Sequence, residues 1–334
     1  MAKTVNSAFK EFMKNTVNLD PNDTAAARDD RNKLRDRIHA LEEKVYRFPR
    51  LATDDDIDFG SFARRTKKRP LDDVDMLFCL HADGCTFTDV GITGIDIDVN
   101  NSSSNLNDYK NAEGKLSSIK VLNKFKSSAA ELYQYRSADL NRRQESVVLK
   151  LNGKDWRFDI VPCFITTEVN SSNFYLIPDG NGKWKKTDPR IDQKRITENN
   201  KHHEGNLLSI VRLAKYWNSR ATMPSIGSYL LENMVINCFA NSSPITNFMD
   251  LNIVRVLDYM QVAIFNDVYD PKGFYGNLNE LSDEDKRKVS ERAILDLARA
   301  RHARELEDHS PSGSHKECIN KWREVFGPEF PIYA

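Results

Sequence analysis

Two aspartates separated by one residue stand inside an apolar run at residues 71–80, and this pattern constrains the fold more than any other feature. Side chains alternate across a β-strand, so Asp73 and Asp75 share one face and the apolar side chains between and beyond them share the other. In a strand that is buried on both faces, two neighbouring carboxylates would be unfavourable, because both charges would lose their contact with water. We therefore expect a strand over residues 73–80 with one face turned to a polar site.

A third carboxylate falls within a predicted hairpin at residues 146–164. Asn152-Gly153, a strong signal for a turn between strands, separates two apolar runs. In the second run Phe158 and Ile160 share a face, and Asp159 points to the opposite one. The sequence thus offers three strand carboxylates that can meet at one place.

Three clustered carboxylates repel one another. At about 4 Å each pair costs about 1 kcal/mol in water and about 4 kcal/mol at an effective dielectric constant near 20. Protonation or bound divalent cations would remove that cost. Oxygen ligands with open positions suit Mg²⁺. We expect two Mg²⁺ ions, replaceable by Mn²⁺, at Asp73, Asp75 and Asp159.

Gly60-Ser61 precedes the aspartate pair by eleven residues. Glycine lets a backbone approach a phosphate closely, and successive N–H groups with a serine hydroxyl bind anions. Alone, the dipeptide is equally typical of a plain turn. The basic run that follows, residues 64–69, could face substrate phosphates or water.

The rest of the chain indicates an α+β protein with two lobes. Helical spacing predicts a long helix over residues 22–47 and another over 116–135. Residues 176–189 are rich in turn formers and read as a loop crossing between lobes, and helical patterns dominate after residue 204. We expect an N-terminal helical segment (1–50), a catalytic core with a mixed sheet (51–175) and a helical C-terminal lobe (176–334).

Composition excludes several classes of protein. Of the 334 residues 40% are hydrophobic and 29% charged, and 49 basic residues balance 49 acidic ones. Zero net charge argues against a surface built for long nucleic acids. Five scattered cysteines do not form a disulfide framework, and neither Cys79, His81 and Cys85 nor His309, His315 and Cys318 have zinc-module spacing. With no apolar membrane span or signal peptide, a cytoplasmic protein without membrane partners is expected.

The Gly-Ser, Asp-x-Asp and later Asp pattern resembles the DNA polymerase β-like nucleotidyltransferases. Four further stretches are similar to bacterial CD-NTases, relatives of cyclic GMP-AMP synthase and oligoadenylate synthase: "IPDGNGKWKKTDP", "SIVRLAKYWNSR", "SYLLE" and "INKWREVFGPEFP". The resemblance implies a bilobed fold with a long N-terminal spine helix.

The resemblance also implies roles for three residues of the helical lobe. Lys215 matches a lysine that holds the donor triphosphate, Ser228 a serine on the same phosphates, and Tyr229 an aromatic that stacks on a base. From the residues alone, Lys215 could equally belong to a solvated helix face. Ser228 could simply cap the helix that begins near Tyr229.

The activity implied is the joining of nucleoside triphosphates, ATP among them, into a cyclic di- or trinucleotide second messenger. In bacteria such a signal activates an effector protein in anti-phage defence. The resemblance leaves three modes of activation open: constitutive activity, a peptide-sensing regulatory partner, or covalent attachment through Ala334. Three alternatives stay open: a linear-product or RNA-tailing enzyme, an adenylylating enzyme, and an inactive nucleotide-binding module.

Overall fold

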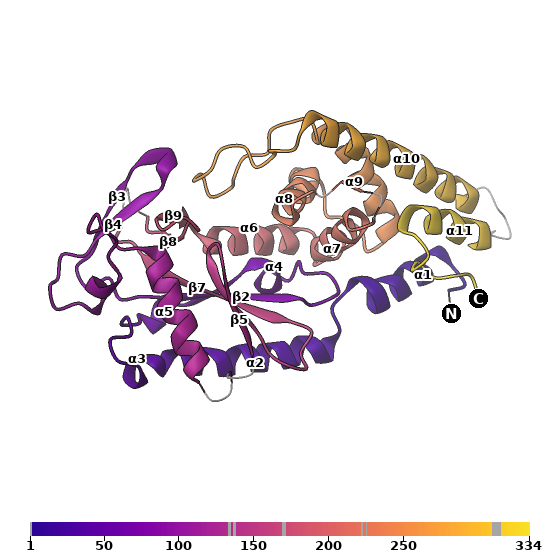
Figure 1. Cartoon of the computed structure of the whole chain (residues 1–334). Coiled ribbons are helices and arrows are strands. Elements are labelled where there is room, and N and C mark those ends of the chain that lie inside the picture. The colour runs from indigo at the N-terminus through magenta and orange to yellow at the C-terminus, as the bar shows by residue number, and fades with distance from the viewer. Residues whose placement is uncertain are drawn as a thin grey trace. The chain divides into compact units, whose positions relative to one another are not determined.

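The computed structural model describes residues 2–132, 135, 138–168, 172–221, 223–224, 226–308 and 315–334. The chain divides into two compact units, each assembled from separated stretches (Figure 1). The sheet unit comprises Asn22–Ala63 and Leu71–Arg190, and the helical unit comprises Met1–Pro21, Arg64–Pro70 and Ile191–Ala334. The short stretch Arg64–Pro70, which we call the strap, thus packs in the helical unit although its sequence neighbours belong to the sheet unit.

A nine-stranded mixed sheet forms the centre of the sheet unit. Its strand order is β1-β2-β7-β8-β9-β4-β3, and β6 joins β5 to β7. The strands are β1 (Ile57–Phe59), β2 (Asp73–Cys79), β3 (Thr86–Asp89), β4 (Ile95–Asp98), β5 (Asp139–Arg143), β6 (Ser146–Lys150), β7 (Arg157–Ile165), β8 (Tyr175–Pro178) and β9 (Trp184–Thr187). β2 and β7 run parallel, and the other pairs are antiparallel.

Helices of the sheet unit cover apolar faces of these strands. They are α2 (Pro21–His39), α3 (Leu41–Lys44), the single turn α4 (Gly60–Ala63) and α5 (Ser118–Glu131). α5 packs on β5, β6, β7 and β8, and the ring of His39 in α2 meets that of Phe78 edge-on. The other face of β2 and β7 carries an apolar cluster around Leu77, Cys79, Val161 and Cys163. The expected helices are confirmed, but the first ends at His39 and not at residue 47.

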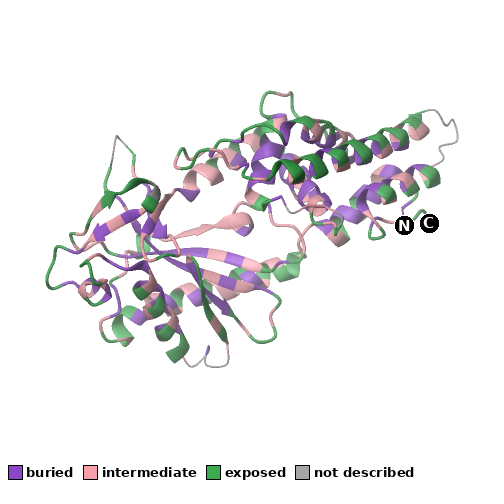
Figure 2. Ribbon diagram, turned by 45° about the horizontal axis from the view of Figure 1, so that its top comes forward, coloured by how far each residue is buried: buried purple, intermediate pink, exposed green. Residues whose placement is uncertain are grey.

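The helical unit buries one large core. It contains α1 (Val5–Phe12), a π-helical turn η1 (Met13–Val17), α6 (Pro189–His202), α7 (Leu207–Asn218), α8 (Ser228–Phe239), α9 (Met249–Ala263), α10 (Asp283–Asp308) and α11 (His315–Phe326). Figure 2 shows buried residues along the sides of these helices that face one another. Trp217 and Trp322 lie fully inside, and Trp217 Nε1 donates to Asp296 Oδ2 at 2.8 Å.

The prediction of a loop at residues 176–189 is wrong. β8 and β9 form a hairpin there, with Gly180 and Gly182 at positive φ in its turn. The buried Trp184 fixes β9, because its Nε1 donates to the Leu116 carbonyl at 3.0 Å. Turn-forming residues dominate the stretch because the hairpin is short, and that masked the strand pattern on either side.

The α+β class expected from the sequence is confirmed. None of the described helices combines the length and apolar character needed to span a bilayer.

Candidate active site

The three strand carboxylates lie on one face of two neighbouring strands. Asp75 on β2 stands directly opposite Asp159 on the parallel strand β7, and Asp73 stands opposite Arg157. All three carboxylates are partly exposed, whereas Val74, Met76, Phe158 and Ile160 on the opposite face are buried. The predicted alternation is therefore confirmed, and Asp159 is a neighbour of the first pair.

Gly60 closes one side of this carboxylate group. β1 pairs with β2 so that Phe59 lies opposite Asp75, and Gly60 follows with a φ of +70°. A Cβ atom on this glycine would lie 1.8 Å from Asp75 Oδ2. No larger residue fits, so the Gly60-Ser61 backbone and the carboxylates belong to one local arrangement.

Arg157 is a member of the group that the sequence argument missed. Its Nη2 lies 3.9 Å from Asp73 Oδ2 and its Nε lies 3.7 Å from Asp159 Oδ1. The guanidinium therefore offsets part of the repulsion among the carboxylates. It is a third way to reduce this repulsion, in addition to protonation and bound metal ions. Strand alternation predicts this position, because Arg157 stands two residues before Asp159 and therefore shares its face.

Asp73, Asp75 and Asp159 are the residues of this group that could contribute ligands to a metal ion. Among the described residues, no three histidine, cysteine, aspartate or glutamate side chains are gathered so as to hold a metal ion as they stand. The chemistry of the donors nevertheless fits Mg²⁺, since carboxylate oxygens from two adjacent strands already accommodate a cationic side chain.

Lys215, Ser228 and Tyr229 all belong to the helical unit. Lys215 on α7 has only 6% of its surface exposed, which excludes a solvated helix face. Its Nζ lies 2.8 Å from Glu232 Oε2 and 3.3 Å from Thr66 Oγ1. Ser228 is the exposed first residue of α8, and Gly227 occupies the N-cap without a side-chain hydrogen bond, so Ser228 is not the helix cap.

Glu232 on α8 organises the cations around it. It accepts hydrogen bonds from Arg64 Nε at 2.7 Å and from Thr66 Oγ1 at 2.8 Å, both on the strap. Burial alone would raise the pKa of Glu232, but the charges of Arg64 and Lys215 outweigh it and lower the pKa to about 2. Burial lowers the pKa of Lys215.

Arg64 and Lys215 together carry one positive charge more than Glu232, and the nearby carboxylate of Asp192 also acts on Arg64. The side chain of Arg64 is only 10% exposed and is paired with Glu232, so this member of the basic run does not face open water. The signal for Glu232 was a lone acidic residue inside the apolar helix α8.

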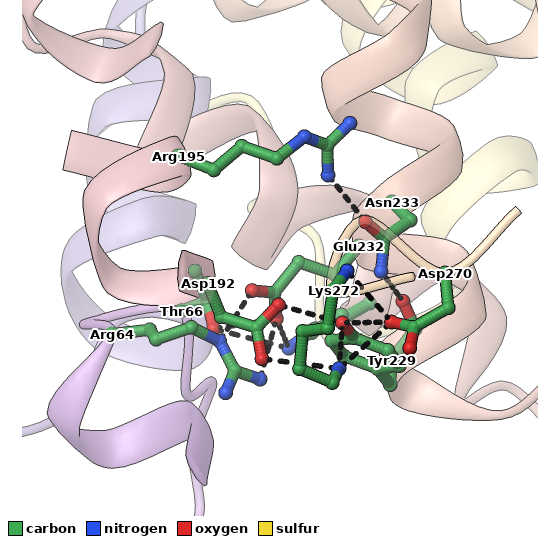
Figure 3. A network of polar contacts seen from close by, with 10 residues as sticks. Arg64, Thr66, Asp192, Arg195, Tyr229, Glu232, Asn233, Asp270 and Lys272 are labelled. Atoms are coloured by element: carbon green, nitrogen blue, oxygen red, sulfur yellow. Dashed lines mark hydrogen bonds and ion pairs between the residues drawn. The ribbon is translucent and has the colours of Figure 1, made fainter. Parts of the chain in front are cut away.

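Tyr229 belongs to the same polar network as Arg64 and Glu232, as Figure 3 shows. Its hydroxyl donates to Asp192 Oδ1 at 2.6 Å and accepts from Lys272 Nζ at 2.5 Å. Lys272 also pairs with Asp270 at 2.9 Å and lies 4.3 Å from the centre of the Tyr229 ring. Burial raises the pKa of Tyr229, and Asp192 raises it further. These contacts fix the orientation of the ring, and the guanidinium of Arg64 also lies over it, 5.6 Å from its centre.

A sequence profile for the second messenger oligonucleotide or dinucleotide synthetase domain matches residues 3–200. The chain belongs to this family. It is 42% identical over 340 residues to a probable cyclic nucleotide synthase of Bacillus cereus (strain VD146), and the alignment covers 100% of this chain and 99% of that one. The expected family, the bacterial CD-NTases, is confirmed.

Solved structures of two related proteins share the fold of this synthetase. CdnC of Escherichia coli MS115-1 with ATP gives a TM-score of 0.69 at 15% identity, and its complex with HORMA-deltaN gives 0.70, each covering 98% of both chains. Escherichia coli DncV bound to 3′-deoxy GTP gives 0.64 at 14% identity over 94% of this chain and 93% of that one. The bilobed polymerase β-like architecture expected from the sequence is confirmed, and the family's activity is synthesis of a cyclic oligonucleotide signal.

Proposed function

We propose that this synthetase joins nucleoside triphosphates, ATP among them, into a cyclic di- or trinucleotide at the carboxylate group. The observation that carries the proposal is the register of Asp75 against Asp159, with the Gly60 backbone packed on Asp75. ATP in the solved CdnC structure supports the substrate class.

Asp73, Asp75 and Asp159 would hold two Mg²⁺ ions, which Mn²⁺ can replace. When bound, such ions lower the charge on the reacting phosphates and stabilise the leaving pyrophosphate. The backbone at Gly60 and the hydroxyl of Ser61 bind phosphate oxygens of the nucleotide. Lys215 and Ser228 are phosphate ligands as well, and Tyr229 stacks on a nucleobase.

The acceptor ribose hydroxyl attacks the α-phosphate of the donor and pyrophosphate leaves. In the closing step a free ribose hydroxyl of the linear intermediate attacks the α-phosphate of its own 5′-triphosphate end, and a second pyrophosphate leaves. These residues act by positioning the reactants and stabilising charge.

The product acts as a signal in bacterial anti-phage defence, where it activates an effector protein in the cytoplasm. The complex of CdnC with HORMA-deltaN supports a regulatory protein partner for this synthetase as well.

The paired substitution Asp73→Asn and Asp75→Asn tests the proposal. We expect incorporation of radiolabelled ATP into product to fall below detection while circular dichroism stays unchanged. Strand β4 offers a matched control, because Asp96 and Asp98 have the same spacing on the same sheet and pair with Lys183 and Lys115. The Asp96→Asn and Asp98→Asn variant keeps its activity. Undiminished incorporation by the first variant would refute the assignment.

A further inference from the structure

A cavity of about 590 Å³ opens in the helical unit, between α1, η1, the strap and the start of α7. Its volume falls within the range of about 300–1,000 Å³ typical of small-molecule sites. The buried side chains of Phe9, Met13 and Met249 contribute an apolar surface to its lining. None of the residues proposed for nucleotidyl transfer lines it.

The charged side chains that line the cavity are mostly cationic. Lys10, Lys14 and Arg69 carry positive charge, and Asp20 is the acidic residue among the described lining residues. Arg69 Nη2 lies 3.7 Å from Asp20 Oδ2, so that pair is close to neutral. Lys10, on α1, and Lys14, on η1, are both exposed at the cavity. Two positive charges therefore remain, and a dianion would relieve their repulsion.

A fourth cation lies behind the cavity wall and orders it. Arg212 donates to Asn18 Oδ1 at 2.7 Å, to Ser209 Oγ at 3.2 Å and to the Arg65 carbonyl at 2.7 Å. Asn18 and Ser209 both line the cavity. Burial, with the neighbouring charge of Arg65, lowers the pKa of Arg212 to about 10. All three acceptors are neutral oxygens, so Arg212 adds to the positive potential of the wall.

Amide side chains supply the remaining polar surface. The π-helical turn η1 contributes Met13, Lys14 and Asn15 to the lining. Asn6, Asn206 and Asn247 line it too. A side-chain amide has both donors and an acceptor, the combination that reads the edge of a planar polar group, and Asn206 uses one donor on the Ile245 carbonyl at 3.0 Å.

We propose that this cavity is a second ligand site, distinct from the nucleotidyl-transfer residues, for a phosphate monoester of about nucleotide size. The phosphate binds Lys10 and Lys14, whose two charges match the charge of about −2 on a monoester at neutral pH. The rest of the molecule lies on the apolar surface and among the amides.

Equilibrium dialysis of the full chain against radiolabelled AMP tests the proposal. EDTA is present throughout, so that metal-dependent nucleotide binding at the carboxylates is suppressed. We expect one AMP per chain, and binding at least tenfold weaker in the Lys10→Ala and Lys14→Ala double variant, because two charge-assisted contacts are lost. Lys194→Ala with Lys201→Ala, a pair of exposed lysines on α6, is the matched control and binds like the parent.

Ribose 5-phosphate added as a competitor defines the ligand further. Competition means that the phosphate and sugar suffice, and lack of competition means that the amides read the base; both results support the site. No AMP binding at millimolar concentration, or equal affinity in the Lys10/Lys14 variant, overturns the proposal. The Asp73→Asn and Asp75→Asn variant keeps AMP binding, so failure of the proposed catalytic role would leave this result intact.

Discussion

At the scale of single residues, Gly60 is a position where two separate constraints exclude any residue with a side chain. Its φ of +70° costs any other L-residue about 1–2 kcal/mol. The close approach to Asp75 Oδ2 is a separate constraint, because a Cβ would overlap the carboxylate. Strain and displacement of Asp75 can therefore be told apart by experiment.

We predict that Gly60→Ala lowers the rate of product formation by about 10²-fold or more, since displacing a reacting group by about 1 Å has that effect. Gly84→Ala is the matched control: Gly84 has a φ of +77° in the same unit, and a Cβ there meets nothing within 4 Å. Both variants lose similar stability in urea titrations, and only Gly60→Ala loses activity. Equal activity of the two variants would show that the contact with Asp75 has no catalytic consequence.

The residues of the carboxylate group could be predicted from sequence because strand alternation is a local rule. Asp73, Asp75 and Asp159 each stand in an apolar run whose period assigns them to one face. Alternation also places Arg157 on this face, but a search for clustered carboxylates does not single out a cationic residue. Glu232 could not be paired with Lys215 and Arg64 in advance, because these residues lie on three separate segments and no periodic pattern connects them.

At the scale of elements, the strap is tied to α7 and α8 by one buried carboxylate. Glu232 is 2% exposed and binds Arg64, Thr66 and Lys215. An ordinary glutamate pKa of 4.5 in the unfolded chain, against about 2 in the folded one, means that Glu232 stabilises the fold fully above pH 4.5. This contribution is lost as the pH falls from 4.5 toward 2, and its size is on the order of 3 kcal/mol.

We predict that Glu232→Gln lowers the free energy of unfolding at pH 7 by about 3–5 kcal/mol, because two cations lose their buried partner. Below pH 4.5 the difference from the parent shrinks as the parent's own carboxylate becomes protonated. Urea titrations from pH 7 to pH 3 measure both effects. Glu198→Gln, an exposed change on α6, serves as control and shifts stability by less than about 0.5 kcal/mol. A constant difference across the pH range would contradict this account of Glu232.

Helices with clear periods were predicted more reliably than short strands. The periods of α2, α5 and α7 extend over three turns or more, whereas β8 and β9 have four residues each. In a four-residue strand alternation yields only two side chains per face, too few to distinguish it from a loop. Tertiary contacts such as the hydrogen bond of Trp184 to Leu116 decide these segments.

At the scale of the whole molecule, the two units carry different parts of the proposed chemistry. The sheet unit holds the carboxylates and the Gly60-Ser61 turn, and the helical unit holds Lys215, Ser228 and Tyr229. The strap and the first 21 residues join the helical unit from a distance in sequence. The contacts that recruit them leave no periodic signal, so sequence analysis could not assign these two stretches by pattern.

The central claim is that the chain closes a ring from nucleoside triphosphates at Asp73, Asp75 and Asp159. The most direct measurement is mass spectrometry of products after incubating the purified protein with ATP, GTP, CTP, UTP and Mg²⁺, before and after phosphatase treatment. We predict a product of two or three joined nucleoside monophosphates that has no terminal phosphate and survives the phosphatase. A product that loses phosphates, or triphosphates that remain unjoined, would contradict the claim.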